Sequence, residues 1–134
     1  MASIHKEFTI AAPAAAVWDA LRDFGAVHIR LAPGFVVDAH SDGVARTVTF
    51  ANGVVARELL VDCDDGRRRL AYAIPPNERL THYSASTQVI DADGAGCRVE
   101  WIVDVLPHTI APYIAAQMEL GILAMKKALD RPAA

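Results

Sequence analysis

The sequence predicts an α+β fold in which a seven-stranded antiparallel sheet wraps around one long C-terminal helix. Three observations predict it: seven runs of β-type residues are separated by turn residues, a short helical pair follows the first run, and one amphipathic segment closes the chain. With 134 residues, 53% of them hydrophobic and 22% charged, the chain is long enough for a core of its own. We therefore expect residues 1–134 to form a single domain.

The N-terminal part predicts one strand and two short helices. Ser3–Ile10 alternates loosely between apolar and polar residues, which is typical of a strand. Pro13 breaks this pattern and is well placed at the start of a helix. Helical spacing of apolar residues then predicts helices over Ala14–Leu21 and Ala26–Leu31, and Pro33-Gly34 ends the second.

Six further strands are expected in a meander. Asn-Gly and Asp-Gly between β-runs are strong hairpin signals, because glycine adopts positive φ without a steric penalty. The predicted strands are Phe35–His40, Ala45–Phe50, Val54–Cys63, Arg67–Ile74, Leu80–Ile90 and Cys97–Leu106. The turns between them are Ser41-Asp42-Gly43, Asn52-Gly53, Asp64-Asp65-Gly66, Pro75-Pro76-Asn77 and Asp93-Gly94-Ala95-Gly96.

The last segment, from Ile110 to about Asp130, is a long amphipathic helix with a broad apolar face. Gly121 lies on that face and costs roughly 1 kcal/mol relative to alanine, which indicates close packing or room beside a ligand. One helix cannot cover seven twisted strands by flat packing, so the sheet has to curl around it. Such wrapping leaves an interior cavity, and a ligand pocket is the first functional expectation.

Charge and hydropathy exclude two classes of partner. The formal net charge of −3 argues against nucleic acid, whose phosphates require a basic protein face. No run approaches the roughly 18 apolar residues of a membrane span, so we expect no stable membrane insertion. The N-terminus lacks the apolar stretch of a signal peptide, and a cytoplasmic protein is expected. It could be a monomer, or a homodimer through an edge strand such as Phe35–His40.

Metal, cofactor and nucleophile motifs are not found. The five histidines are scattered, and neither Cys63 nor Cys97 lies beside one, so no metal site is expected. Both cysteines are expected to be free, buried thiols, because strands three apart in a meander hold them too far apart to bridge. The sequence contains no Gly-x-Ser-x-Gly elbow and no phosphate-binding glycine loop, and no cofactor is expected.

Several short segments, in this order and spacing, resemble a known family. They are Ile10-Ala11-Ala12-Pro13 with Val17-Trp18, Asp23-Phe24, Arg46…Gly53…Glu58, Tyr72, Tyr83-Ser84-Ala85 and Val99-Glu100-Trp101. The chain resembles the helix-grip fold of the START/Bet v-like (SRPBCC) superfamily, in its polyketide cyclase/dehydrase and lipid-transport group. Members bind sterols, lipids, hormones or aromatic polyketides, and some catalyse cyclisation or dehydration. The resemblance implies ligand entry between the C-terminal helix and the loops at one end of the sheet.

Glu58 is the main candidate for polar chemistry, and its orientation is open. Alternation places Glu58 with Ala56, Leu60 and Asp62 on one face of the strand, but both faces mix polar and apolar residues. Residues 77–83 also resemble the gate-loop segment of the plant abscisic-acid receptors, which belong to the same superfamily. By this resemblance, Glu58 and Tyr83 match residues that line the pocket of those receptors. An inward Glu58 would be a ligand acceptor or general base. The alternative is an exposed glutamate paired with Arg46 or Arg57.

The leading hypothesis is therefore a protein that binds one small hydrophobic or aromatic metabolite between sheet and helix. The predicted ligand-binding residues are Glu58, Tyr72 and Tyr83 as polar contacts, with Phe35, Trp101, Met118, Ile122 and Met125 as the apolar wall. One alternative is an enzyme of polyketide cyclase or dehydratase type, with Glu58 or a histidine as acid or base. A second alternative is a protein-interaction module, which would have an exposed apolar patch and a closed interior.

Overall fold

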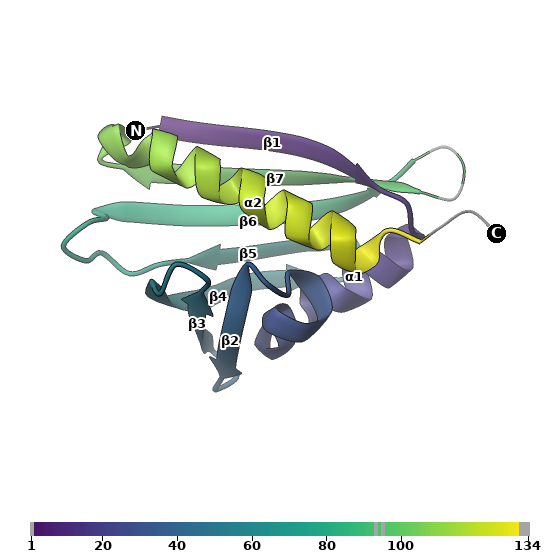
Figure 1. Cartoon of the computed structure of the whole chain (residues 1–134), viewed down its shortest axis with the longest axis horizontal. Coiled ribbons are helices and arrows are strands. Elements are labelled where there is room, and N and C mark those ends of the chain that lie inside the picture. The colour runs from purple at the N-terminus through teal and green to yellow at the C-terminus, as the bar shows by residue number, and fades with distance from the viewer. Residues whose placement is uncertain (1, 93, 95, 132–134) are drawn as a thin grey trace.

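The structure of this chain is a computed structural model that describes residues 2–92, 94 and 96–131. Seven antiparallel strands form a sheet in the order β1-β7-β6-β5-β4-β3-β2 (Figure 1). The strands are β1 (Ala2–Ile10), β2 (Val36–Ser41), β3 (Ala45–Phe50), β4 (Val55–Asp64), β5 (Arg69–Ala73), β6 (His82–Asp91) and β7 (Cys97–Leu106). The predicted α+β fold is confirmed, and each strand end lies within two residues of its predicted position.

The sheet is strongly twisted, which creates a concave face. In Figure 1 the strands β1, β7 and β6 run along the long axis of the molecule, whereas β2 and β3 cross it steeply. Neighbouring strands in a sheet rotate by roughly 20–25° relative to each other, so seven of them accumulate a large turn. The inner face is apolar, with Val99, Val103 and Val105 of β7 buried there.

A register irregularity lies in β4, between Leu60 and Asp62. Simple alternation predicts that Asp62 shares the face of Glu58, but Asp62 is exposed. The pairing instead places Cys63 opposite the buried Leu70, so Cys63 turns inward and is half-buried. An extra residue in one strand reverses every orientation beyond it, which explains why Asp62 leaves the face of Glu58 and lies in solvent.

The short helices after β1 form a cap at one end of the concave face. The first, α1 (Ala14–Arg22), has the predicted position. The predicted second helix is instead a 3₁₀ turn, Phe24–Ala26, followed by one π-helical turn, Val27–Leu31, which the hydrogen bond from Ala32 N to Val27 O closes at 2.8 Å. A side chain at Gly25 would lie 3.0 Å from Cβ of Ser41, so close packing against β2 shapes this segment.

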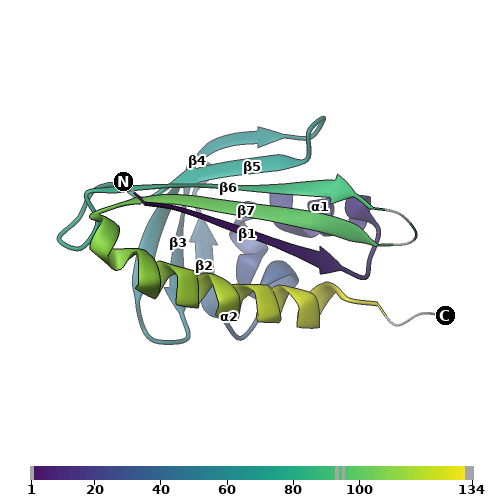
Figure 2. The same cartoon turned by 90° about the horizontal axis from the view of Figure 1, so that it is seen from above.

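The helix α2 (Ala111–Leu129) follows a 3₁₀ turn at His108–Ile110 and packs across the concave face (Figures 1 and 2). It buries the predicted apolar face, which includes Ile114, Met118, Gly121, Ile122, Met125 and Leu129. Its C-terminal end is anchored to the chain between β1 and α1. Ala11 N donates to Asp130 Oδ1 at 2.8 Å, and Arg131 N donates to Ala11 O at 2.7 Å.

Both cysteines are free, as predicted, with Cys97 fully buried and Cys63 half-buried. The predicted turn at 93–96 includes Asp93 and Ala95, which lie outside the described residues. Among the helices of the described chain, none combines the length and apolar character that crossing a bilayer requires.

A cavity between the sheet and the C-terminal helix

The concave face of the sheet and α2 enclose a cavity of about 710 Å³. Each layer of the fold contributes apolar side chains to its wall. Leu31 comes from the short helical turns, Val48 and Phe50 come from β3, and Met118 and Met125 come from α2. Phe35 packs against Phe50 with ring centroids 5.2 Å apart, which closes the wall on the side of β2 and β3.

Exposed lining residues mark the mouth of the cavity. They come from the β3–β4 turn at Asn52-Gly53, the β5–β6 loop at 77–79 and the first turns of α2 at Tyr113. Asn52 Nδ2 donates to the Tyr113 hydroxyl at 3.0 Å, and this bond spans the mouth. Gly53 adopts φ of +87°, which the tight turn requires. The mouth thus lies between the N-terminal end of α2 and two turns of the sheet.

The most unusual feature of the wall is a buried ion pair between Arg46 and Glu58. The two residues lie directly opposite each other on β3 and β4, so the hairpin register brings their side chains together on the inner face. Arg46 Nε donates to Glu58 Oε1 at 2.7 Å, and both side chains are only 6% exposed. Glu58 therefore points inward and is also paired with Arg46, which combines the two orientations left open by the sequence.

Aromatic groups hold the Arg46 guanidinium in place. Its Cζ atom lies 4.0 Å from the centroid of the Phe24 ring and 5.2 Å from that of Tyr72. Arg46 Nη1 also donates to the Phe24 carbonyl oxygen at 3.2 Å. Stacking, a backbone bond and a carboxylate together fix the guanidinium plane, so the pair is a rigid polar spot in an apolar wall.

Tyr72 and Tyr83 lie beside this pair and line the same cavity. Burial and the negative charge of Glu58 raise the pKa of Tyr72. Burial first, and then the neighbouring Tyr72 and Glu58, raise the pKa of Tyr83 well above its usual value. Both phenols therefore keep their protons at neutral pH and can donate hydrogen bonds into the cavity.

Of the predicted apolar wall, four members line the cavity: Phe35, Trp101, Met118 and Met125. The fifth, Ile122, is buried in the core and is not among the residues that line the cavity. Successive helical residues are rotated by about 100°, so Gly121 faces the cavity while Ile122 packs beside it. A side chain at Gly121 would lie 3.1 Å from Trp101 and 3.2 Å from Phe35, so the glycine allows their close approach.

The sequence analysis names Arg46 in the family resemblance and as a possible partner for Glu58, but not as a wall residue. The alternation of Arg46, Val48 and Phe50 along β3 is the signal that could have found it, since all three line the cavity. An arginine in such a position is normally assigned to solvent, because charged side chains are rarely buried unless they are paired.

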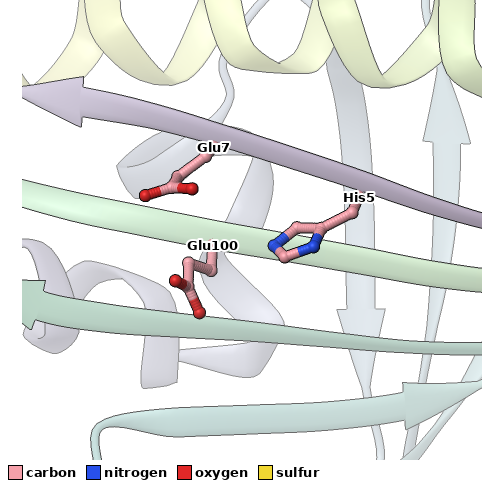
Figure 3. Close-up of side chains that lie close together, drawn as sticks. All are labelled: His5, Glu7 and Glu100. Carbon is pink, nitrogen blue, oxygen red and sulfur yellow. The ribbon is translucent and has the colours of Figure 1, made fainter.

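A separate cluster of possible metal ligands lies on the outer face of the sheet (Figure 3). His5 and Glu7 extend from β1 and Glu100 from β7, and their ligand atoms lie within 4.8 Å of one another. Arg98 already pairs with Glu7 at 2.9 Å and with Glu100 at 3.5 Å. The cluster is therefore a cross-strand ion-pair group, and it is separated from the cavity by the thickness of the sheet.

Several solved structures share the fold of this chain. An uncharacterised protein from Bacillus thuringiensis is 18% identical with a TM-score of 0.84, and the match covers 95% of this chain and 98% of that one. A START superfamily protein from Mycobacterium smegmatis is 12% identical with a TM-score of 0.76, covering 95% and 96% of the two chains. Likenesses at such identities show the fold alone.

A third structure is the di-domain ARO/CYC BexL from the BE-7585A biosynthetic pathway. It is 15% identical with a TM-score of 0.81, and the match covers 96% of this chain but only 46% of the BexL chain. No curated protein matches the sequence. The profile of the family described as "Polyketide cyclase / dehydrase and lipid transport" matches residues 1–131. Because this profile matches nearly the whole chain, and the helix-grip fold around α2 agrees with it, the chain belongs to the polyketide cyclase/dehydrase and lipid-transport family of the SRPBCC (START/Bet v-like) superfamily.

Proposed function

We propose that this protein binds one small, mostly apolar or aromatic metabolite in the cavity between the curved sheet and α2. The observation that carries the proposal is a cavity of about 710 Å³ that opens at its mouth and has an apolar wall with a few clustered polar groups. Ligand sites in proteins typically have volumes of about 300–1,000 Å³ and this kind of lining. The ligand enters at the mouth between Asn52, the 77–79 loop and Tyr113.

The apolar wall is sufficient for useful affinity without catalysis. A ligand that buries about 250 Å² of apolar surface, roughly one large aromatic group, gains about 6 kcal/mol at about 25 cal/mol per Å². That corresponds to a dissociation constant of some tens of micromolar. Polar contacts with Glu58, Tyr72 and Tyr83 would orient the ligand rather than supply most of its affinity.

Filling the cavity is the direct test. Ala56 lies on β4 and lines the cavity, so Ala56→Trp places an indole in the empty space. We expect this variant to lose the thermal shifts that members of a hydrophobic-metabolite panel produce, while its own melting temperature stays equal or rises. Val61→Trp is the matched control, because Val61 lies on the same strand but is 64% exposed and does not line the cavity. Equal ligand responses in both variants, or no response to any panel member in the unmodified protein, would contradict the proposal.

A polyketide cyclase or dehydratase activity is the second candidate. It is favoured by a buried carboxylate and two protonated phenols on the wall of one cavity, and the ARO/CYC protein BexL shares the fold. Glu58 would move a proton on a carbonyl-bearing substrate, and Tyr83 would donate to the developing oxyanion. Glu58→Gln and Tyr83→Phe separate the two functions, because they abolish turnover by an enzyme but only weaken affinity in a binding protein. A protein-interaction module is disfavoured, since it requires a closed interior.

A further inference from the structure

Trp101 has a buried hydrogen-bond donor that the protein leaves unused. It lies in the middle of β7, lines the cavity and is only 8% exposed. Among the described residues, its indole Nε1 has no hydrogen-bond partner. The other tryptophan, Trp18, is different, because its Nε1 donates to Asp65 Oδ1 at 2.8 Å. Buried indole N–H groups normally have a partner, so the free donor of Trp101 calls for an acceptor from outside the chain.

Packing fixes the direction of this donor. A side chain at Gly121 would lie 3.1 Å from both Cζ3 and Cη2 of Trp101, so this edge of the indole rests against α2. In the six-membered ring, Cζ3 is opposite Cε2, the atom that carries Nε1. The nitrogen side of the ring therefore points away from Gly121, toward the part of the wall formed by β5 and β6.

The hydroxyl of Tyr72 lies close to this side of Trp101, and Tyr83 lies next to Tyr72. The indole N–H nevertheless makes no bond of acceptable geometry to either phenol. A phenol can donate or accept, whereas an indole can only donate. The carboxylate nearby, Glu58, already accepts from Arg46. The indole N–H is thus a donor without an acceptor at this point of the cavity, and the two phenols can donate hydrogen bonds beside it.

The charge of the wall argues for an uncharged ligand atom at that point. Arg46 and Glu58 neutralise each other inside the cavity. The other charged lining residues, Glu78 and Arg79, have opposite charges and are exposed at the mouth. A ligand carboxylate would add a second negative charge beside Glu58 without a free buried cation to balance it.

We infer that the cavity recognises a neutral carbonyl oxygen on its ligand through the indole N–H of Trp101, with the hydroxyls of Tyr72 and Tyr83 as neighbouring donors. The inference rests on the proposed function, since it names the ligand class of the same cavity. The expected ligand is an apolar or aromatic ketone, aldehyde, ester or quinone. Its carbonyl lies deep in the cavity, and its apolar body contacts the wall near Met118.

Two matched probes test this in the full-length, ¹⁵N-labelled protein. In 2-acetonaphthone a carbonyl replaces the CH₂ group of 2-ethylnaphthalene, and the two molecules are otherwise alike. Nuclear magnetic resonance reports each indole N–H separately, and Trp18→Phe assigns the two signals. We expect 2-acetonaphthone to move the Trp101 indole proton downfield and 2-ethylnaphthalene to leave it nearly unmoved. The Trp18 signal is the internal control, because its donor is already bonded to Asp65 and lies outside the cavity.

Affinity gives the second readout. One neutral hydrogen bond corresponds to a preference for the ketone of about 3- to 10-fold, after allowance for the weaker hydrophobic transfer of the carbonyl. Trp101→Phe keeps an aromatic wall but removes the donor, so the ratio of the two dissociation constants should fall by that factor. Changes in cavity shape affect both probes and cancel in the ratio. In Trp18→Phe the ratio should stay as in the unmodified protein.

The outcomes separate the inference from the proposed function. If both probes bind but the Trp101 indole proton responds equally to each, or the ratio is unchanged by Trp101→Phe, the carbonyl inference is wrong and ligand binding stands. Stronger binding of 2-naphthoate than of 2-acetonaphthone would also overturn the inference, since it would show recognition of an anion. If neither naphthalene binds, the inference fails together with the binding of aromatic ligands.

Discussion

Replacing the buried Arg46–Glu58 pair provides a sharp energetic test of the cavity wall. Glu58→Leu removes the carboxylate and leaves the Arg46 guanidinium buried without a counter-charge. Breaking a buried pair by removing one partner typically costs about 3–5 kcal/mol of unfolding free energy. Arg46→Met should cost at least as much. This substitution leaves Glu58 buried without a counter-charge, and it also removes the donor to the Phe24 carbonyl and the stacking on the Phe24 ring.

The double variant Arg46→Met/Glu58→Leu carries no buried charge, so most of the penalty should disappear. The remaining loss of unfolding free energy comes from the unpaired Phe24 carbonyl, which costs about 1 kcal/mol, and from the lost cation–π contact, which costs about 0.5–2 kcal/mol. We therefore expect the double variant to lose about 1–3 kcal/mol. Independent effects would instead sum to about 6–10 kcal/mol. The difference is the coupling energy of the pair.

Urea denaturation of the four proteins at neutral pH measures these free energies. The surface pair Arg57–Asp42 is the matched control, since its atoms are 3.2 Å apart but both side chains are 53% exposed. Arg57→Met should cost less than about 1 kcal/mol. A double variant at Arg46 and Glu58 that loses the sum of the two single losses would refute the reasoning, because the residues would then not neutralise each other in the folded protein.

Three further predictions follow from single residues. Burial raises the pKa of Tyr72, so the native protein keeps this proton while the tyrosine of the unfolded chain ionises above pH about 10, and the free energy of unfolding should fall as the pH rises through that range. Tyr72→Phe should reduce the slope of unfolding free energy against pH by up to about 1.4 kcal/mol per pH unit, and Tyr113→Phe, at an exposed tyrosine, is the control. Cys97 is fully buried, and burial is the main cause that raises the pKa of its thiol. Mass spectrometry after treatment with a thiol reagent should therefore find only Cys63 modified until denaturant is added, and modification of Cys97 in the native protein would contradict the packing. Gly121→Ala gains about 1 kcal/mol of helix propensity, but the added Cβ pushes Trp101 and Phe35 into the cavity. Calorimetry should therefore show weaker ligand binding and a nearly unchanged melting temperature, and an undiminished affinity would show that the two rings do not move.

The strands could be predicted from the sequence because their determinants are local. Alternation along Ala45–Phe50 and Cys97–Leu106 and the turn residues between strands reproduce both of these strands to the residue. The second helix could not be predicted equally well. A 3₁₀ turn and a π-helical turn at 24–31 depend on the approach of Gly25 to Ser41, a contact between segments that no local pattern encodes.

The candidate site divides in the same way. Met118 and Met125 follow from the apolar periodicity of the last helix, and both line the cavity in the structure. The orientation of Asp62 depends on an irregularity in β4 that leaves no mark in the residue types. The free donor of Trp101 is a property of three-dimensional packing, since the same indole with an acceptor in reach would be an ordinary core residue.

Arg46 and Glu58 are the case in which local pattern and register disagree. Hydropathy assigns both residues to solvent, because an unpaired buried charge is too costly. The register of the hairpin, centred on Asn52-Gly53, nevertheless places them directly opposite each other. Two opposite charges that face one another across a hairpin can enter the interior together, and Val48 and Phe50 on the same strand face make the interior the favoured side. Cross-strand register is thus the information that would have turned two ambiguous polar residues into an expected buried pair.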